Sequence, residues 1–425
     1  MIKSEVKYMS QYKGFYKKSI AERLEILKRD RHINPDYFGS LPASTYNNMI
    51  ENAITTFELP MGVSPNYCIN GRQIVIPMVT EEPSVIAASS NAANIIKQNG
   101  GFTSSVISRV MRGEIAFVNP NNPQAIQDFI ETHQEALFDN AHQAHPSIIK
   151  RGGGVQSITT RHITKDDNTL VIVDVLVDTQ EAMGANMINT ILESLRTLIE
   201  TNTQEHALMA ILTNNTPECL VHAHCTLDPS TLKFSDTIGQ KITEASLLSK
   251  LDPFRTATHN KGIMNGVDAI LIATGNDWRA VNAGIYSYHS RNGQLEPFTT
   301  WSLNDEGMIC GETTLPLALG SVGGSIGLNP KVKLAYEILG FHDVKSLMEC
   351  IACVALAQNF AAIYALTTDG IQKGHMALHA RNLALKAGAK PTEVEALVHL
   401  LLKQPHLNSD TAKACLEQLK ATHSS

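Results

Sequence analysis

The spacing of hydrophobic and polar positions predicts a chain in which helices and strands are mixed. Apolar residues at helical spacing predict an amphipathic helix over residues 19–31. The apolar run at residues 73–79 predicts a strand, and Pro83 after it suits the first position of a helix. The pair Gly100-Gly101 suits the end of that helix, which is rich in alanine and serine and so permits close packing or the approach of a ligand.

The pattern changes between about residues 103 and 215, where short apolar runs predict strands that alternate with helices. This mixture is typical of a smaller α+β domain inserted into a larger one. A run of three glycines, Gly152-Gly153-Gly154, falls in a loop inside it. The predicted strands are residues 106–110, 114–118 and 169–177, and the predicted helices are residues 123–138 and 187–200.

The longest apolar run, residues 351–366, predicts a buried helix. It is interrupted by Gln358 and Asn359 and is shorter than the roughly 20 residues that a membrane span needs. We therefore expect a protein that is not embedded in a membrane. From Gly374 onward the chain reads as a small helical appendage, with predicted helices at residues 375–387, 391–403 and 409–420.

A lysine and an aspartate flank a short apolar run that predicts a buried strand at residues 269–273. Lys261 and Asp277 would meet only if the polar residues before the strand fold back along it. A lysine held against an aspartate in a cleft would stay charged and could oppose a developing oxyanion. The alternative is a solvated lysine in a turn and an aspartate that caps a helix beginning at Trp278. Spacing alone favours this alternative.

Composition describes an ordinary globular chain. Its 425 residues allow two or three domains, and 43% of them are hydrophobic and 18% charged. The net charge of −6, without a long basic or acidic block, argues against a nucleic-acid surface as the main function. The seven cysteines are scattered, odd in number and sparse, which argues against a disulfide framework and favours a reducing cytoplasm. The first 18 residues show no apolar segment of a signal peptide.

Three pairs of potential metal ligands occur, each without the further ligands that a metal needs. We therefore expect buried thiols and ordinary histidines, and no metal. The pairs are Cys350 and Cys353 in the apolar run, His222 and His224 on one face of a strand, and His375 and His379 one helical turn apart.

The glycine pattern also excludes two nucleotide-binding folds. Neither G-x-G-x-x-G nor G-x-x-x-x-G-K-[ST] occurs, so a Rossmann fold or a P-loop has no support. Residues 323–327 and 152–154 remain as backbone cradles for phosphate or as tight turns. Glu82, at the junction of a strand and a helix, is either a partner of the helix dipole or, in a cleft, a general acid.

Short motifs recur in a fixed order from about residue 15 to 420. Each is modest alone, and their joint order is specific. They are Glu51-Asn52 with Thr56-Phe57, Glu81-Glu82-Pro83-Ser84, Lys150-Arg151-Gly152-Gly153-Gly154, Ala182-Met183-Gly184-Ala185-Asn186, Asp252-Pro253-Phe254-Arg255 with Thr258-His259-Asn260-Lys261-Gly262, Thr274-Gly275-Asn276-Asp277-Trp278-Arg279-Ala280, residues 323–330, and Gly374-His375-Met376.

Taken together, these motifs resemble the class II, bacterial type of 3-hydroxy-3-methylglutaryl-coenzyme A (HMG-CoA) reductase. The resemblance implies an α+β multidomain fold: a large substrate-binding domain with a central helix, an inserted small α+β cofactor domain that is not a Rossmann fold, and a helical C-terminal flap. The expected boundaries are 1–105 and 216–370 for the large domain, 106–215 for the small domain and 371–425 for the flap. The implied reaction reduces HMG-CoA to mevalonate and coenzyme A by two hydride transfers.

The resemblance also implies a role for each of four residues. Lys261 would stabilise the oxyanion formed as each hydride arrives, and Asp277 would hold Lys261 charged and in place. Glu82 would supply a proton at the mevaldehyde stage. His375, on the flap, would protonate the departing coenzyme A thiolate. The matching substrate-binding residues are Ser84, Arg255, Thr258 and Asn265, of which the Arg255 guanidinium fits a carboxylate.

The cofactor expected from the resemblance is NADPH rather than NADH. Relatives that prefer NADH carry an acidic residue where this chain has His145, and Lys150 and Arg151 follow closely. Two cations near an imidazole favour the 2′-phosphate of NADPH. The alternative is that both cations point to solvent and both cofactors work. The matching cofactor-binding residues are His145, Lys150, Arg151, Met183, Asn186 and Asn214.

Two positions depart from the family pattern. A glycine is usual where this chain has Thr55, which would be strained if the backbone needs a positive φ there. Glu181 replaces the usual aspartate and lengthens the acidic side chain. We expect a homodimer, possibly a trimer of dimers, since residues 51–57 match the family's dimer element. A pseudoenzyme on the same fold and a reductase of another short acyl-CoA are the alternatives.

Overall fold

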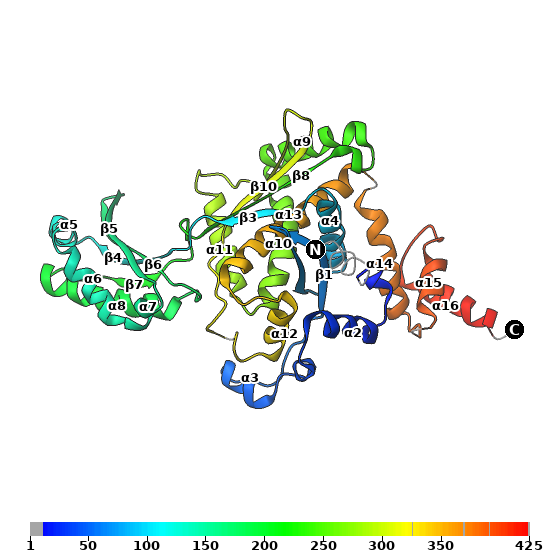
Figure 1. The fold of residues 1–425 in the computed structure, drawn as a ribbon, viewed down its shortest axis with the longest axis horizontal. Helices are drawn as coiled ribbons and strands as arrows, with labels where there is room; N and C mark the ends of the chain where they lie inside the picture. Colours follow the sequence, from blue (N-terminus) through cyan, green and yellow to red (C-terminus); the bar gives the residue numbers. More distant parts are fainter. Residues whose placement is uncertain (1–11, 325, 369, 391, 424–425) are drawn as a thin grey trace.

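The structure is a computed structural model that describes residues 12–423 except 325, 369 and 391. It is a mixed α/β chain with three antiparallel sheets, and its elements gather in three regions (Figure 1). A central region holds two of the sheets, a small region with the third sheet extends on one side, and the C-terminal helices extend on the opposite side.

The central region is built on a hairpin and a four-stranded sheet. The hairpin pairs β1 (Met61–Ile69) with β2 (Arg72–Val79), which confirms the strand predicted at residues 73–79. In the second sheet the strand order is β3-β8-β10-β9, so neighbours come from distant parts of the sequence. Its strands are β3 (Thr103–Val106), β8 (Leu220–Leu227), β9 (Thr299–Leu303) and β10 (Ile309–Pro316).

Helices pack on and between these two sheets. The helix α13 is buried over most of its length and contacts α10, α4, α9 and the second sheet. It is the one described helix long and apolar enough to cross a membrane, and two thirds of its apolar window is buried inside the protein, as in a core helix. The helices are α4 (Val85–Gln98), α9 (Ser235–Leu251), α10 (Pro253–Ala273), α11 (Trp278–His289), α12 (Pro330–Leu339) and α13 (Val344–Thr367).

The strand predicted at residues 269–273 is wrong: the run is the last part of α10. Because α10 is covered by α13, α9 and β2, it is apolar on most of its sides and shows no clear helical period. The start signal lies in Asp252-Pro253, where Asp252 caps the helix and Pro253 takes the first position. Gly266, which resembled a turn residue, lets α10 approach α13, since an added Cβ would lie 2.9 Å from Gln358 Oε1 and 3.0 Å from Val354 Cγ1.

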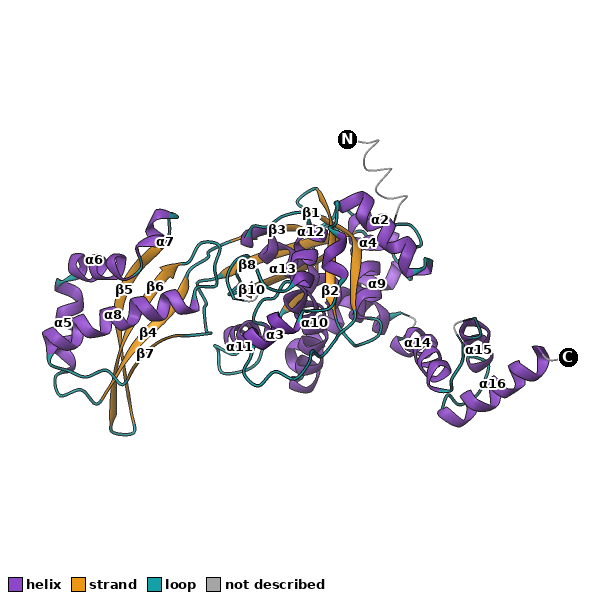
Figure 2. Cartoon of the chain, turned by 90° about the horizontal axis from the view of Figure 1, so that it is seen from below, coloured by secondary structure: helices purple, strands orange, loops and turns teal. Residues whose placement is uncertain are grey.

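The small region is a four-stranded antiparallel sheet in the order β5-β6-β4-β7, with helices packed against it (Figure 2). The strand predicted at residues 106–110 lies instead in β3 and the connection after it. The helix predicted at residues 123–138 is two helices that meet at His133. The elements are β4 (Met111–Val118), α5 (Pro123–Thr132), α6 (Gln134–Ala144), α7 (Pro146–Lys150), β5 (Gly154–Lys165), β6 (Asn168–Asp178), α8 (Ala185–Thr203) and β7 (Met209–Leu212).

The outer parts of the described chain are mainly helical. The C-terminal helices bury their own apolar cluster around Leu383, Leu397 and Leu416, separate from the main core. Short 3-10 turns occur at Phe15–Lys17, Pro35–Phe38 and Pro229–Thr231, and the terminal helices are α2 (Ile20–Arg31), α3 (Ala43–Met49), α14 (Ile371–Lys386), α15 (Val394–Leu401) and α16 (Ser409–His423).

None of the seven cysteines, all of which lie in the described residues, forms a disulfide. Cys350 and Cys353 are fully buried on α13, and burial raises the pKa of both thiols. His222 and His224 lie side by side on β8, with ring centroids 5.8 Å apart. Within the described residues no group of three histidine, cysteine or acidic side chains is arranged to hold a metal.

Candidate active site

Three polar side chains meet where β2 ends and the long helix α10 passes. The Lys261 ammonium lies 2.9 Å from Glu82 Oε2, and Asn265 Nδ2 donates to Glu82 Oε1 at 3.4 Å. The exposed fractions of the Lys261 and Glu82 side chains are 61% and 41%, so a ligand can reach both. The structure therefore brings together a cation, a carboxylate and an amide that sequence spacing alone could not connect.

The local sequence explains this meeting. Lys261 and Asn265 are one turn apart on α10, and Arg255 and Thr258 precede them at the same helical spacing on one face. Thr258 is exposed, whereas Arg255 and Asn265 are half-buried. On the opposite side, Thr80 Oγ1 accepts the backbone N–H of Glu82 at 3.1 Å and fixes the turn that presents the carboxylate.

Ser84, the residue before α4, has a strained backbone. Its φ of 76° lies in the left-handed region, where a non-glycine residue costs about 1–3 kcal/mol. Such strain is often found at functional sites, where the surrounding structure holds it. The conformation places Ser84 directly beside the turn that carries Glu82.

Asp277 does not pair with Lys261 among the contacts of the described residues. Its Oδ1 accepts the backbone N–H groups of Arg279 and Ala280 at 3.0 and 3.2 Å, which makes it the N-cap of α11. The Arg279 guanidinium also lies 3.3 Å from Oδ1. The cap predicted for Asp277 is thus confirmed, whereas the predicted turn at Lys261 is wrong: Lys261 lies on α10, and the carboxylate beside it is Glu82.

A buried polar network holds α10 against β9 and α13, and sequence analysis missed it. The His259 ring contacts Thr299 Oγ1 at 3.0 Å and Asn359 Nδ2 at 3.2 Å. Asn359 Oδ1 in turn accepts from Thr299 and from Trp301 Nε1, at 2.9 and 2.8 Å. Burial, with a smaller contribution from the nearby Arg255 charge, lowers the pKa of His259 to about 4, so the ring is neutral near pH 7.

A second missed contact joins α10 to α11. Asp268, two turns beyond Lys261, accepts a hydrogen bond from Asn282 Nδ2 at 2.7 Å. Burial raises the pKa of Asp268, while the bond from Asn282 partly opposes the shift. The position of Asp268, seven residues after Lys261 on the same helix face, was the available signal, but it was hidden because the segment was assigned to a strand.

The residues expected to bind the cofactor lie at two places in and beside the small region. His145 and Arg151 flank α7, Lys150 is its last residue, and both cations are exposed. The turn after α7 needs glycine, because a Cβ on Gly153 would lie 2.5 Å from the Asp178 carbonyl oxygen. The chain from 145 to 154 contains no acidic residue.

The second place is the connection between β6 and α8, which holds Met183 and leads to Asn186. Gly184 caps α8 with a φ of 92°, and an added Cβ would lie 2.5 Å from Thr179 Cγ2. No side chain caps the first turn of α8, and no acidic residue lies in it. Asn214 is exposed. It lies close to α11, the helix that Asp277 caps, because a Cβ added to Gly284 of α11 would lie 2.8 Å from the Asn214 backbone oxygen.

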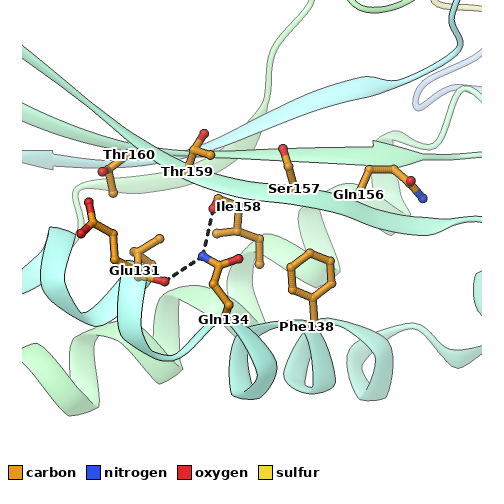
Figure 3. A pocket seen from close by; sticks show the side chains of 9 residues that line it. Glu131, Gln134, Phe138, Gln156, Ser157, Ile158, Thr159 and Thr160 are labelled. Carbon is orange, nitrogen blue, oxygen red and sulfur yellow. Dashed lines mark hydrogen bonds between the residues drawn. The ribbon is translucent and has the colours of Figure 1, made fainter.

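His375 belongs to α14, but its side chain lies outside the described residues. Thr55 is free of the strain that its position suggested, since it does not adopt a positive φ; Asn52, three residues earlier, does, with a φ of 55°. A hollow of about 550 Å³ lies elsewhere, between α5, α6 and β5, where Gln134 donates to the Ile158 carbonyl (Figure 3). No predicted site residue lines it.

Comparison with known proteins identifies the fold around these residues. The hydroxymethylglutaryl-coenzyme A reductase family profile matches residues 19–380. A 3-hydroxy-3-methylglutaryl-coenzyme A reductase of Archaeoglobus fulgidus is 39% identical over 97% of this chain and 95% of its own length. The chain belongs to the HMG-CoA reductase family.

The solved structures agree with this assignment. An HMG-CoA reductase from Streptococcus pneumoniae has 43% sequence identity and a TM-score of 0.82, covering 96% of this chain and 99% of that one. A class II enzyme from the same organism, described as bound to NADPH in open conformations, has a TM-score of 0.81 over 84% of this chain and all of that one. As a member of the family, the chain is an oxidoreductase of the mevalonate route that reduces HMG-CoA to mevalonate.

Proposed function

We propose that Lys261 and Glu82 perform the oxyanion and proton chemistry of HMG-CoA reduction in this chain. The observation that supports this is their direct ion pair at 2.9 Å, with both side chains open to a ligand. A fixed ammonium group can oppose the negative charge that develops on the thioester carbonyl oxygen, and again on the aldehyde oxygen of mevaldehyde. Such a group acts only if it already stands in place, and the Glu82 carboxylate keeps it there.

The same pair provides a route for the proton. Glu82 lies within hydrogen-bond distance of Lys261, so once Glu82 has taken up a proton from solvent it can replace the proton that the ammonium gives to the alkoxide. Asn265 holds the other Glu82 oxygen, which orients the carboxyl toward Lys261. Asp277 would act from the N-terminus of α11 and not as the direct partner of Lys261.

The substrate would lie along the exposed face of α10. Arg255 offers a guanidinium for the free carboxylate of the hydroxymethylglutaryl group, and Thr258 and Ser84 offer hydroxyl groups. Arg255 stands near the beginning of the helix and Lys261 two turns later, so the two cations can meet opposite ends of the acyl group. The substrate and product partners proposed are HMG-CoA, mevalonate and coenzyme A.

The nicotinamide cofactor would bind in the small region, and two cofactor molecules, bound one after the other, would supply one hydride each. The described residues fit a phosphorylated dinucleotide: Lys150 and Arg151 are exposed, and the first turn of α8 offers uncapped backbone N–H groups near Met183 and Asn186. The relative described as bound to NADPH supports NADPH as a cofactor, and the proposed preference over NADH rests on Lys150, Arg151 and the lack of an acidic residue from 145 to 154.

The choice between the two cofactors is tested at His145. We expect the unmodified chain to have a higher kcat/KM with NADPH than with NADH. Replacement of His145 by aspartate would place a negative charge where the 2′-phosphate is expected, and should shift that ratio toward NADH by roughly tenfold, as for one charge-assisted contact. An unchanged ratio would remove His145 from the account.

We further propose a division into a large domain (1–105 and 216–370), a small cofactor domain (106–215) and a C-terminal flap (371–425). The separate core of α14–α16 supports the flap as a unit that can move. His375 on the flap would protonate the leaving thiolate. In His375→Gln the reduction of HMG-CoA should therefore fall much more than the reduction of mevaldehyde, and equal losses would contradict the role.

We also propose a homodimer, possibly assembled into a trimer of dimers, in a reducing cytoplasm. The support is the exposed apolar side chains of Ile50, Ile54 and Phe57, of which the last two keep 89% and 91% of their exposure. Seven cysteines without a disulfide suit a reducing compartment. Light scattering should show at least a dimer, and full specific activity in a monomeric fraction would contradict the proposal.

The activity itself is tested by the oxidation of NADPH in the presence of HMG-CoA. Reduction of a thioester to an alcohol consumes two hydrides, so two NADPH should disappear for each coenzyme A released. The Lys261→Ala protein, prepared in the same way, controls for contaminating reductases. A ratio of one NADPH per coenzyme A would indicate that the reaction stops at the aldehyde, and no oxidation would contradict reductase activity under the assay conditions.

A further inference from the structure

Residues 317–322 follow β10 and run between two parts of the candidate site. On one side they contact the connection at residues 179–184, which holds Met183; we call it the cofactor loop. On the other side they contact Asn276, the residue before Asp277. We call residues 317–322 the strap.

The strap is closely joined to the cofactor loop. The backbone N–H of Ser321 donates to the Glu181 carbonyl oxygen at 2.8 Å, and Ala182 and Val322 form a parallel bridge. Gly320 permits this approach, because an added Cβ would lie 2.9 Å from the Met183 backbone nitrogen.

Two side chains reinforce the same junction. Arg109 is buried, with an exposed fraction of 8%. Its Nη2 donates to the carbonyl oxygens of Ala182 and Leu319, at 2.7 and 3.0 Å. Glu181, the residue that replaces the usual aspartate, accepts from the Ser321 hydroxyl and from the backbone N–H of Val344 at 2.8 Å. Its longer side chain therefore ties the cofactor loop to the strap and to the N-terminus of α13.

The other side of the strap is joined to the Asp277 turn. Asn276 Oδ1 accepts the backbone N–H of Gly320 at 2.9 Å, and its Nδ2 donates to Thr274 Oγ1 at 3.1 Å. Thr274 is fully buried and donates to the Ile270 carbonyl at the end of α10. Asn276 is thus held between the strap and α10, and the next residue, Asp277, caps α11.

We propose that Asn276 is a positioning residue of the reductase, which uses the strap to set the Asp277 turn relative to the cofactor loop. This inference rests on the proposed roles of Asp277 and of residues 179–184. The Asn276 side-chain oxygen bonds to Gly320 of the strap, and the strap bonds to the cofactor loop. This one oxygen therefore connects the cofactor loop, where we expect the nicotinamide end, to the turn that carries Asp277. Loss of that oxygen should therefore disturb the placement of Asp277 more than the binding of either ligand.

The test is a double-mutant cycle on turnover, with Asn276→Ala, Asp277→Ala and the double variant assayed with HMG-CoA and NADPH. Asn276→Ala should lower kcat about tenfold and leave both KM values within about threefold. In the Asp277→Ala background the same change should have little further effect, because a residue that acts through Asp277 cannot act in its absence.

Two further variants separate positioning from general stability. Asn276→Asp keeps an oxygen for the Gly320 N–H and should retain most of the turnover. Asn99→Ala is the matched control, because Asn99 Oδ1 also accepts a backbone N–H, that of Asp228, at 2.9 Å. This variant should leave kcat unchanged. If Asn276→Ala does not fold, Asn276→Ser takes its place in the cycle with the same expectations.

The outcomes distinguish the inference from the proposed function. Additive losses in the cycle, or an Asn276→Asp protein as slow as Asn276→Ala, would overturn the positioning role and leave the role of Asp277 intact. Full turnover in Asp277→Ala would overturn the proposed role of Asp277 and the inference with it. A tenfold, non-additive loss with rescue by Asn276→Asp is the result that we expect.

Discussion

Lys261 and Glu82 contact each other directly, with Asn265 beside them, whereas Lys150 and Arg151 are exposed and make no ion pair with another described residue. Lys261 and Asn265 lie on a long helix that the His259–Asn359 network holds in place, and Glu82 lies in the turn after β2, whereas Lys150 and Arg151 lie at the end of a five-residue helix. Transition-state stabilisation needs groups that stand in place before the reaction, whereas recognition of a charged cofactor needs accessible charge. The contrast supports the proposal that the first set performs the chemistry and the second contributes cofactor affinity.

Removal of the Lys261 ammonium should have the largest effect. In Lys261→Ala both HMG-CoA and mevaldehyde reduction should fall about 1,000-fold in kcat, because both reactions pass through an oxyanion. Lys250→Ala, which removes an exposed lysine from the end of α9, is the matched control and should retain full turnover. Loss of only one of the two reductions would restrict Lys261 to a single step.

The buried network behind α10 should make the protein sensitive to acid. The pKa of His259 is about 4 in the folded chain, against about 6.5 for an unfolded histidine. Between these values the unfolded chain binds a proton that the folded chain does not, so the free energy of unfolding falls as the pH decreases. For this one residue the loss should be about 2 kcal/mol between pH 8 and pH 5.

Urea unfolding at the two pH values measures this loss. His259→Gln is expected to be less stable at pH 8, but its further loss at pH 5 should be about 2 kcal/mol smaller than that of the unmodified chain. His406→Gln, at an exposed position, should leave the difference unchanged. The same acid loss in His259→Gln and the unmodified protein would contradict the buried, neutral state of the ring.

Removal of the cations beside α7 should have a smaller effect, confined to the cofactor. In the double variant Lys150→Ala/Arg151→Ala, the KM for NADPH should rise about tenfold, while kcat changes little, because exposed cations contribute affinity and not transition-state contacts. The increase should shrink at high salt, which screens exposed charges. A large fall in kcat would place these cations in the chemistry.

The sequence predicted much of the fold but not the last part of the central helix α10. The helices at residues 19–31 and 187–200 and the strand at residues 73–79 are confirmed because each has a clear pattern or a clear end signal. The end of α10 was assigned to a strand, because a helix buried on most sides loses its polar face and with it the helical period.

The candidate site shows a similar limit. Spacing alone favoured a solvated Lys261 and a capping Asp277, and the cap is what the structure shows. The partnership of Lys261 with Glu82 spans 179 positions and depends on how β2 and α10 pack, which no local pattern encodes. The roles of Glu82, Lys261, Asp277 and His375 came from the resemblance to the family, and their residue-level assignment stays a prediction.

The separation of chemistry from cofactor affinity is tested most directly by measuring NADPH binding and turnover in the same Lys261→Ala protein. Titration of NADPH fluorescence should give a dissociation constant within about threefold of the unmodified chain, while kcat falls about 1,000-fold. A protein whose NADPH affinity falls as much as its turnover, or which turns over normally, would contradict the account.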